Sequence, residues 1–211
     1  RCLVMDLDPS AGATRHLGVP GNSFAGALEL LNNDERLANL VVVEGMPKNV
    51  ELVPSRPQLA ELETLLSKYA DRTRLLDGPL AEARQYYDFI LLDTAPNAGA
   101  VTTIAAYSAA EWCLLAAFPH PLSLAGIEEA CRDMVDVRAF RNPELETIGV
   151  VFGNVDNRVK HLRESMADQV AQRNSAWLFE TQIAQNVLLA RLSGVGITVF
   201  QQAGHERLPV A

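Results

Sequence analysis

Two aspartates follow a short apolar stretch near the start of the sequence, and they are candidates for metal binding or for catalysis. The segment LVMDLDPSAGAT places Asp6 and Asp8 at the end of a candidate strand, before Pro9 and a loop of small residues. Ligands of open α/β sheets bind at the carboxyl ends of strands, where two carboxylates can hold a metal-bound water or orient a nucleophile. A purely structural alternative is a turn at Asp8-Pro9, with Asp6 as a cap.

A third aspartate ends a second apolar stretch. In YDFILLDTAPNAGA, Asp93 closes the stretch, and a loop with Pro96 and Gly99 follows. A carboxylate at the tip of a buried strand is the Walker B arrangement, which lies beside a nucleotide's Mg²⁺, often through a coordinated water. The alternative is that Asp93 caps a helix beginning near Val101. Together the two segments predict acids at one edge of one parallel sheet, where a phosphate-bound Mg²⁺ would need them.

The elements that must position these acids alternate between short apolar stretches and longer helical patterns, which is typical of parallel strands joined by crossover helices. Strands are expected at Leu3–Leu7, Leu40–Glu44, Val50–Val53, Phe89–Asp93, Cys113–Phe118 and Ile148–Phe152. Helices are expected at Ala25–Leu31, Gln58–Tyr69, Leu80–Tyr86, Val101–Ala109, Leu124–Phe140 and Val159–Gln172. Strands as apolar as FILLD and CLLAAF suit a sheet that is covered on both faces. The pattern predicts a doubly wound, mostly parallel α/β sheet with helices on both faces.

Composition narrows the class of protein. A chain of 211 residues with 48% hydrophobic and 21% charged residues fits one globular domain, which we expect over residues 1–211. No apolar stretch approaches the roughly 18 to 20 residues of a membrane span, so a soluble intracellular protein is expected. Three cysteines without ligand spacing indicate neither a disulfide framework nor a zinc site. The net charge of −8 argues against blanket binding to nucleic acid, so any DNA site must be a local patch.

Five segments, in order, resemble motifs of the ParA/MinD-type deviant Walker A ATPase superfamily, most closely those of the Soj-like ParA partition ATPases. DLDPSAGAT is similar to DLDPQGNAT, ELVPSRPQLAELE to LIPSNxxLAxxE, and YDFILLDTAPNAG to YDxIIIDxPPSLG. RNPELETIGVVFGNVDNR is similar to RNPxLxIxGVLLTMFDxR, and TQIAQNVLLARLSGVGITV to TxIPRNVxLxEAPSxGxPV. The resemblance spans nearly all of the chain and implies the fold of P-loop NTPases.

The resemblance also implies residue roles. Asp8 takes the position that orients the hydrolytic water, with Asp6 close to the nucleotide on the same strand end, and Asp93 takes the Walker B role toward Mg²⁺. The other nucleotide-binding positions that it implies are Ser10 and Pro96 in the two loops, with Asn154 and Asn186 near the base. An asparagine after a strand is also a common turn residue.

The chain departs from the family pattern at several positions. Ser10, Ala11 and Gly12 replace Gln-Gly-Asn, Ala95 replaces the first proline of the DxPP loop, and Gln185 replaces an arginine used for DNA. The family's first strand and its KGGVGKTT-type phosphate-binding loop would precede Arg1. We expect the chain to be a trimmed piece of a longer protein, shortened at the N-terminus and also at the C-terminus, because loss of that strand would leave a central gap in the sheet. The alternative is a degenerate member that binds ATP poorly.

The function that the resemblance implies is an ATP- and Mg²⁺-dependent dimerisation switch. It would bind DNA nonspecifically, respond to a ParB-like or other ATPase-stimulating partner, and segregate or position plasmid, chromosome or protein cargo in the cytoplasm, on the nucleoid. The candidate DNA-binding residues, which could equally form a solvated helix face, are Arg158, Lys160, Arg163 and Arg191. The alternatives are a non-catalytic ATPase-like adaptor and a MinD-like positioning ATPase; the latter needs an amphipathic C-terminal helix, and none is found before the chain ends at Ala211.

Overall fold

Five strands form two parallel sheets in the computed structural model, within the residues that it describes: 1–20, 24–32, 35–66, 72–97, 99–156, 164–165, 168–170 and 178–202. The first sheet has the order β2-β1-β3, with β1 at Cys2–Asp6, β2 at Val50–Val53 and β3 at Phe89–Asp93. The second consists of β4 at Trp112–Ala117 and β5 at Glu146–Phe152. Parallel pairing places the carboxyl ends of neighbouring strands at one edge of each sheet.

Helices cover both faces of the first sheet. Leu3 and Met5 of β1 are fully buried against residues of five helices: α2 (Ala27–Leu31), α3 (Leu37–Leu40), α4 (Leu59–Leu66), α5 (Asp77–Ala83) and α6 (Val101–Ala109). Val4 points to the opposite face, which α1 (Gly12–His16) covers near the strand ends. A short 3-10 helix lies at Arg72–Arg74. The alternation of buried side chains along β1 therefore fixes which helices lie on which side.

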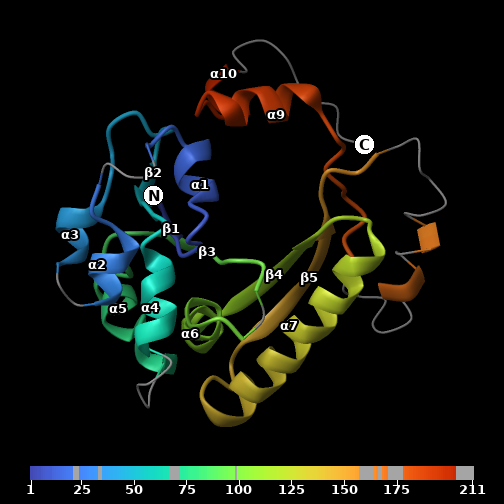
Figure 1. Cartoon of the computed structure of the whole chain (residues 1–211), viewed down its shortest axis with the longest axis horizontal. Helices are drawn as coiled ribbons and strands as arrows, with labels where there is room; N and C mark the ends of the chain where they lie inside the picture. Colours follow the sequence, from blue (N-terminus) through green and yellow to red (C-terminus); the bar gives the residue numbers. More distant parts are fainter. Residues whose placement is uncertain are drawn as a thin grey trace.

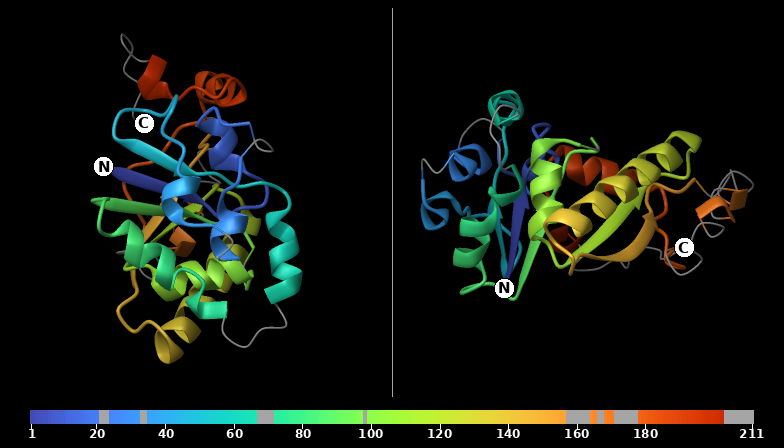
Figure 2. Two further views of the ribbon diagram at one scale, coloured as in Figure 1. Left: turned by 90° about the vertical axis from the view of Figure 1, so that its left-hand side faces the viewer. Right: turned by 90° about the horizontal axis from the view of Figure 1, so that it is seen from below.

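The second sheet has one well-packed face. α7 (Pro121–Phe140) lies along the length of β4 and β5, as Figures 1 and 2 show. Met134 and Val137 of α7 are buried against Cys113 of β4, and Ile127 packs with Phe152 of β5. A long amphipathic helix thus covers this side of the sheet.

Exposed apolar side chains lie on β3 of the first sheet and on β4 of the second sheet, where the two sheets adjoin. Among the described residues, β3 pairs only with β1 and β4 pairs only with β5, so each has one unpaired edge. Phe89 and Leu91 of β3 are 66% and 55% exposed, and Trp112 and Leu114 of β4 are 59% and 50% exposed. Strands this apolar are normally buried on both faces in a parallel sheet. The composition of β3 and β4 is therefore that of interior strands, although each has an unpaired edge.

The chain returns from the second sheet to the first through its last described helices. Residues 178–185 follow β5, with Ile183 N–H donating to Phe152 O at 2.9 Å and Gln185 N–H to Val155 O at 2.8 Å. α9 (Val187–Gly194) then crosses to α1, and α10 (Val199–Gln202) follows it (Figure 1). No helix that the structure describes is long and apolar enough to cross a membrane.

The predicted fold class is confirmed, and most predicted elements are present. The strand expected at Leu40–Glu44 is wrong: Leu40 ends α3 and is buried in the core, and only Val42 forms a single antiparallel bridge, to Leu52. A turn at Gly45, where φ is +80°, ends this segment before a ladder can form. Of the helix expected at Val159–Gln172, only residues 164–165 and 168–170 are described, and they are helical. The short helix α1 and α9 were not predicted.

Candidate functional site

The carboxyl ends of β1 and β3 bring the three predicted acids together. Asp6 and Asp93 are register partners in the parallel ladder, and Leu7 N–H donates to Asp93 O at 2.7 Å. Asp8 lies two residues beyond the end of β1, and its charge acts on Asp93. The predicted convergence of these carboxylates at a single sheet edge is therefore confirmed. We call the group formed by Asp6, Asp8 and Asp93 the acidic rim.

Asp6 is fully buried and its carboxylate is held by internal donors. Its Oδ2 accepts from Thr14 N–H at 2.8 Å and from Thr14 Oγ1 at 2.6 Å, and its Oδ1 accepts from Asp8 N–H at 3.1 Å. Thr14 Oγ1 accepts in turn from Ser55 N–H at 2.8 Å. Burial raises the pKa of Asp6, and the Thr14 hydrogen bonds oppose that rise. This network ties β1, α1 and the end of β2 to one carboxylate.

The network contains residues that the sequence did not single out. Thr14 lies within the DLDPSAGAT segment, but its role requires that α1 fold back over the end of β1. Ser55 is 41 positions further on, and only the pairing of β2 with β1 brings it close. The spacing of residues in the sequence could not have indicated the hydrogen bond between Ser55 and Thr14.

Asp8 is half-buried, and Ser10 holds its carboxylate. Ser10 N–H donates to Asp8 Oδ1 at 2.7 Å, and Ser10 Oγ donates to Asp8 Oδ2 at 2.6 Å. Ala11 follows with a left-handed φ of 53° and is the N-cap residue of α1. The exposed Ser10 side chain therefore fixes the direction of Asp8 in a tight turn of the kind that aspartate and serine favour.

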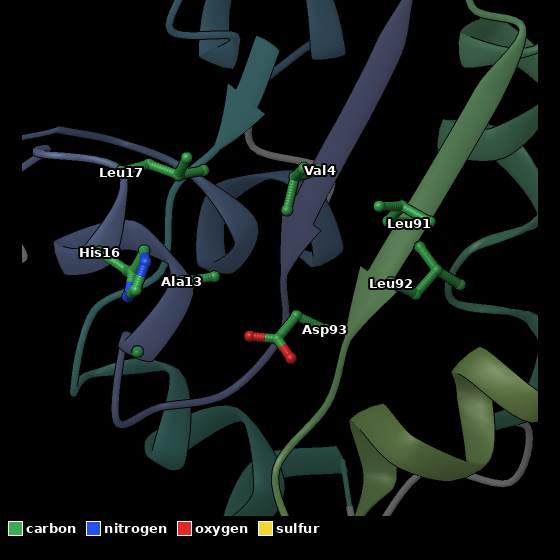
Figure 3. Close-up of a pocket in the computed structure, with 8 residues that line it drawn as sticks. Val4, Ala13, His16, Leu17, Leu91, Leu92 and Asp93 are labelled. Atoms are coloured by element: carbon green, nitrogen blue, oxygen red, sulfur yellow. The ribbon is translucent and has the colours of Figure 1, made fainter. Parts of the chain in front are cut away.

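Asp93 faces a cavity of about 440 Å³ between the first sheet and α1. Val4, Leu91, Leu92 and Asp93 line it from the strands, and four residues of α1 and its end line the other side, namely Gly12, Ala13, His16 and Leu17. Figure 3 shows the Asp93 carboxylate directed toward the α1 side of this cavity. The Asp93 side chain is exposed, yet desolvation by the surrounding protein, and then the negative charges of Asp6 and Asp8, raise its pKa to about 6.

The loop that follows β3 is anchored from α7. Gly99, with φ +74°, donates its N–H to Asp133 Oδ2 at 2.7 Å, and α6 begins two residues later at Val101. Asp93 is not the N-cap residue of α6, because that position is held by Ala100. The predicted nucleotide-binding residue Pro96 is exposed in this loop. Asp133, on a helix forty residues downstream of Asp93, could not have been identified from the sequence.

The two asparagines predicted near a base lie on neighbouring segments at the end of the second sheet. Asn154 follows β5 with a left-handed φ of 51° and is exposed. Val155 bridges Ala184, which places Asn154 beside the segment that leads into Asn186. The Asn186 side-chain oxygen accepts from Leu188 N–H at 2.8 Å and caps α9, so its amide NH₂ remains the group that could contact a ligand.

Of the predicted DNA-binding residues, only Arg191 can be placed. It is exposed in the last turn of α9. Arg158, Lys160 and Arg163 lie outside the described residues. No statement about a shared basic surface follows from the structure.

The carboxylates of the acidic rim suit a cation such as Mg²⁺ that takes its remaining ligands from waters and phosphate oxygens. No group of three His, Cys, Asp or Glu side chains suited to hold a metal by itself occurs within the described part of the chain. Mg²⁺ in nucleotide sites is bound by one or two carboxylates plus waters and phosphate oxygens, so it does not require such a group. A cation at the rim would also relieve the mutual repulsion that raises the pKa of Asp93.

We expect the Asp93 carboxyl to titrate near pH 6 in a ¹³C NMR experiment. In an Asp8→Asn variant its pKa should fall, because one neighbouring negative charge is removed, while Asp88→Asn, before the opposite end of β3, should leave it unchanged. A raised pKa means that the folded protein binds this proton more tightly than the unfolded chain. This group therefore favours folding below about pH 4, and that contribution is lost as the pH rises through about 6. An Asp93 pKa near its ordinary 3.8 would contradict the described rim.

Comparison with known families and sequences gives consistent matches. A model of the AAA domain family matches residues 1–147. The chromosome-partitioning ATPase Soj of Thermus thermophilus is 30% identical over 206 residues, covering 96% of this chain and 76% of Soj. The chromosome partitioning protein ParA of Myxococcus xanthus is 25% identical, covering 93% of this chain and 69% of that protein. An uncharacterized Mycobacterium tuberculosis protein is 27% identical, and the chain spans only 61% of its length.

Solved structures share the architecture. Cobyrinic acid a,c-diamide synthase from Mycobacterium smegmatis with bound ADP and magnesium superposes with a TM-score of 0.76 at 25% identity, covering 92% of this chain and 77% of that one. A complex of ATP with an aspartate-to-alanine variant of Cyanothece McdA gives a TM-score of 0.78 at 18% identity, covering 96% of this chain and 78% of that one. The second likeness shows the fold alone.

Proposed function

The chain belongs to the ParA/MinD-type ATPase superfamily, and from that premise we propose that it is a ParA-like ATPase that uses Mg²⁺ and ATP as a dimerisation switch. The observation that carries this proposal is the acidic rim, in which register pairing holds Asp6 and Asp93 side by side and Asp8 acts on both. Relatives with ATPase in their names and a neighbour with bound ADP and magnesium support it.

Within this proposal the three acids have different tasks. Asp93 would hold the Mg²⁺, which supplies charge neutralisation for the phosphates. Asp8, half-buried and at the surface of the rim, would orient the attacking water and accept its proton. Asp6 would act as a positioning residue, because its carboxylate is fully buried and occupied by Thr14 and Asp8 N–H. Ser10 would hold the Asp8 carboxylate in a fixed orientation through its two hydrogen bonds.

The phosphates need donors that the acidic rim does not offer. We propose that a strand followed by a glycine-rich loop binds along the unpaired edges of β3 and β4, where exposed apolar side chains suit an interior position. Such a loop would emerge at the carboxyl ends of the strands, next to Asp93, and its backbone N–H groups would cradle the phosphates. Asn154 and Asn186, at the end of the second sheet, would then face the base, with Pro96 beside the phosphates.

Nucleotide binding would promote a dimer because ATP has a higher affinity for the dimeric state, and hydrolysis would shift the population back to monomers. We propose that the ATP-bound dimer binds DNA nonspecifically and that a ParB-like or other partner stimulates hydrolysis. The cargo would be a plasmid, a chromosome or a protein assembly in the cytoplasm, on the nucleoid. Pairing of two protomers would double any basic surface and so strengthen phosphate contacts.

The full-length protein is expected to bind DNA only with Mg²⁺ and ATP, and Arg191→Glu should weaken that binding at low salt. The slope of log affinity against log salt is negative, and each lost phosphate contact should reduce its magnitude by about 0.9, so Arg158→Glu with Lys160→Glu should reduce it further. Arg84→Glu, whose side chain reaches Ala109 O and Glu111, is the matched control. Fluorescence anisotropy of labelled DNA measures the affinity, and light scattering the mass.

Two results would count against this function. A protein that binds no nucleotide would favour the non-catalytic adaptor. A nucleotide-dependent dimer whose DNA affinity is the same in all variants would place the DNA surface elsewhere.

A further inference from the structure

Two glycines that are far apart in the sequence make a backbone contact between α1 and α9. Gly18 has φ +84°, and a Cβ placed on it would lie 2.7 Å from Gly196 O. Gly196 has φ +67°, and a Cβ placed on it would lie 2.4 Å from Gly18 Cα. Both conformations and the short separation require glycine at each position. The end of α1 and the turn after α9 are therefore closely apposed.

A side-chain hydrogen bond reinforces the same contact, and each of the two segments carries a buried apolar residue. His16 Nδ1 and Ser193 Oγ are 2.9 Å apart, and both residues are half-buried. Leu192 of α9 is 4% exposed and Val19, just after α1, is also 4% exposed. Figure 1 shows α9 reaching α1 from the side of the second sheet, above the strand ends. We call the contact formed by His16, Gly18, Ser193 and Gly196 the rim latch.

The rim latch joins elements that hold opposite sides of the candidate site. At one end, α1 is fixed to the acidic rim, because Thr14 donates two hydrogen bonds to Asp6. At the other end, α9 begins at Asn186, whose side chain caps the helix beside the end of the second sheet. A shift of α1 relative to the rim must therefore either move α9 or break the latch.

We propose that the four residues of the rim latch are positioning residues that couple the Asp8 loop to Asn186 and set the distance between the two halves of the site. This proposal rests on the proposed function in one respect, the identity of the ligand. The ligand is taken to be a nucleotide whose phosphates lie at the acidic rim and whose base lies near Asn186. The mechanical coupling of α1 to α9 follows from the contacts themselves. It makes Gly18 and Gly196 determinants of nucleotide affinity without contact to the nucleotide.

The coupling is tested by hydrogen exchange of individual amides in the nucleotide-free, full-length protein. In Gly196→Ala, the added Cβ must push α9 from Gly18, so amides within both α9 and α1, such as Ala190 and Leu17, should exchange at least about 10-fold faster. Ser193→Ala, which removes one hydrogen bond without strain, should give a smaller change, and Ser193→Thr should restore protection. Thr14→Val, at the opposite end, should accelerate exchange in α9.

Gly194→Ala is the matched control, because it lies in α9 and a Cβ there meets no atom within 4 Å. Unchanged exchange of α1 amides in both Gly196→Ala and Ser193→Ala would overturn the proposal. With Mg²⁺ and ATP, Gly196→Ala should raise KM about 10-fold with little change in kcat, whereas an unchanged KM would refute the coupling to the site. A wild-type protein that binds no nucleotide would end the proposed function, and the exchange results would still decide whether α1 and α9 are coupled.

Discussion

Asp8→Ala protein is expected to bind Mg²⁺ and ATP, to remain dimeric with ATP present, and to hydrolyse it at least about 100-fold more slowly than the unmodified protein. Asp8 is the member of the acidic rim that is neither fully buried nor part of a strand, and Ser10 donates two hydrogen bonds to its carboxylate. Its removal takes away the group that orients water while leaving Asp93 for the metal. Phosphate release measures the rate, and light scattering follows the dimer.

Asp88→Ala is the control for that experiment. Asp88 precedes the opposite end of β3, and its side chain is 75% exposed, so its loss should leave hydrolysis unchanged. Hydrolysis at the unmodified rate in Asp8→Ala would remove Asp8 from the mechanism. Loss of nucleotide binding, in place of loss of turnover, would instead show that Asp8 binds the metal.

Asp6→Ala is expected to lower the free energy of unfolding by about 3 kcal/mol, measured by urea denaturation. The substitution leaves three donors in a buried site without their acceptor, at a cost of about 1 to 3 kcal/mol each. The substitution also removes a carboxylate whose burial is unfavourable, as the raised pKa of Asp6 shows. The removal of this buried charge offsets part of the cost. The net effect should therefore be smaller than the sum of the three bonds.

Asp6→Asn keeps one acceptor and should be less destabilising than Asp6→Ala. Asp8→Ala serves as the comparison, because it loses the two hydrogen bonds from the exposed Ser10 and should change stability by less than about 1 kcal/mol. Equal losses in Asp6→Ala and Asp8→Ala would mean that the network around Asp6 does not hold the Asp8 loop.

The sequence was sufficient to place Asp6, Asp8 and Asp93 at one sheet edge, because the alternating α/β pattern indicates one parallel sheet, whose strands all present their carboxyl ends at the same edge. It was also sufficient for α6 and most of α7, whose apolar residues recur at helical spacing. Those features depend on local pattern alone.

Contacts between distant segments could not be read in the same way. The Thr14–Ser55 bond depends on β2 pairing with β1, and the Gly18–Gly196 contact depends on α9 crossing from one sheet to the other. The failed strand at Leu40–Glu44 has the same origin, since the burial of Leu40 in the core favoured a helix over a β-like apolar run. Tertiary packing decided each of these cases.

Replacing Mg²⁺ with paramagnetic Mn²⁺ tests whether the acidic rim binds the metal of a bound nucleotide. With a non-hydrolysable ATP analogue, Mn²⁺ should broaden the amide NMR signals of Asp8, Asp93 and Thr94 and leave those of Glu51 and Asp88, at the far strand ends, sharp. In Asp93→Ala this broadening should be lost. Broadening centred on another part of the molecule, with Asp8 and Asp93 unaffected, would show that the metal binds away from the acidic rim.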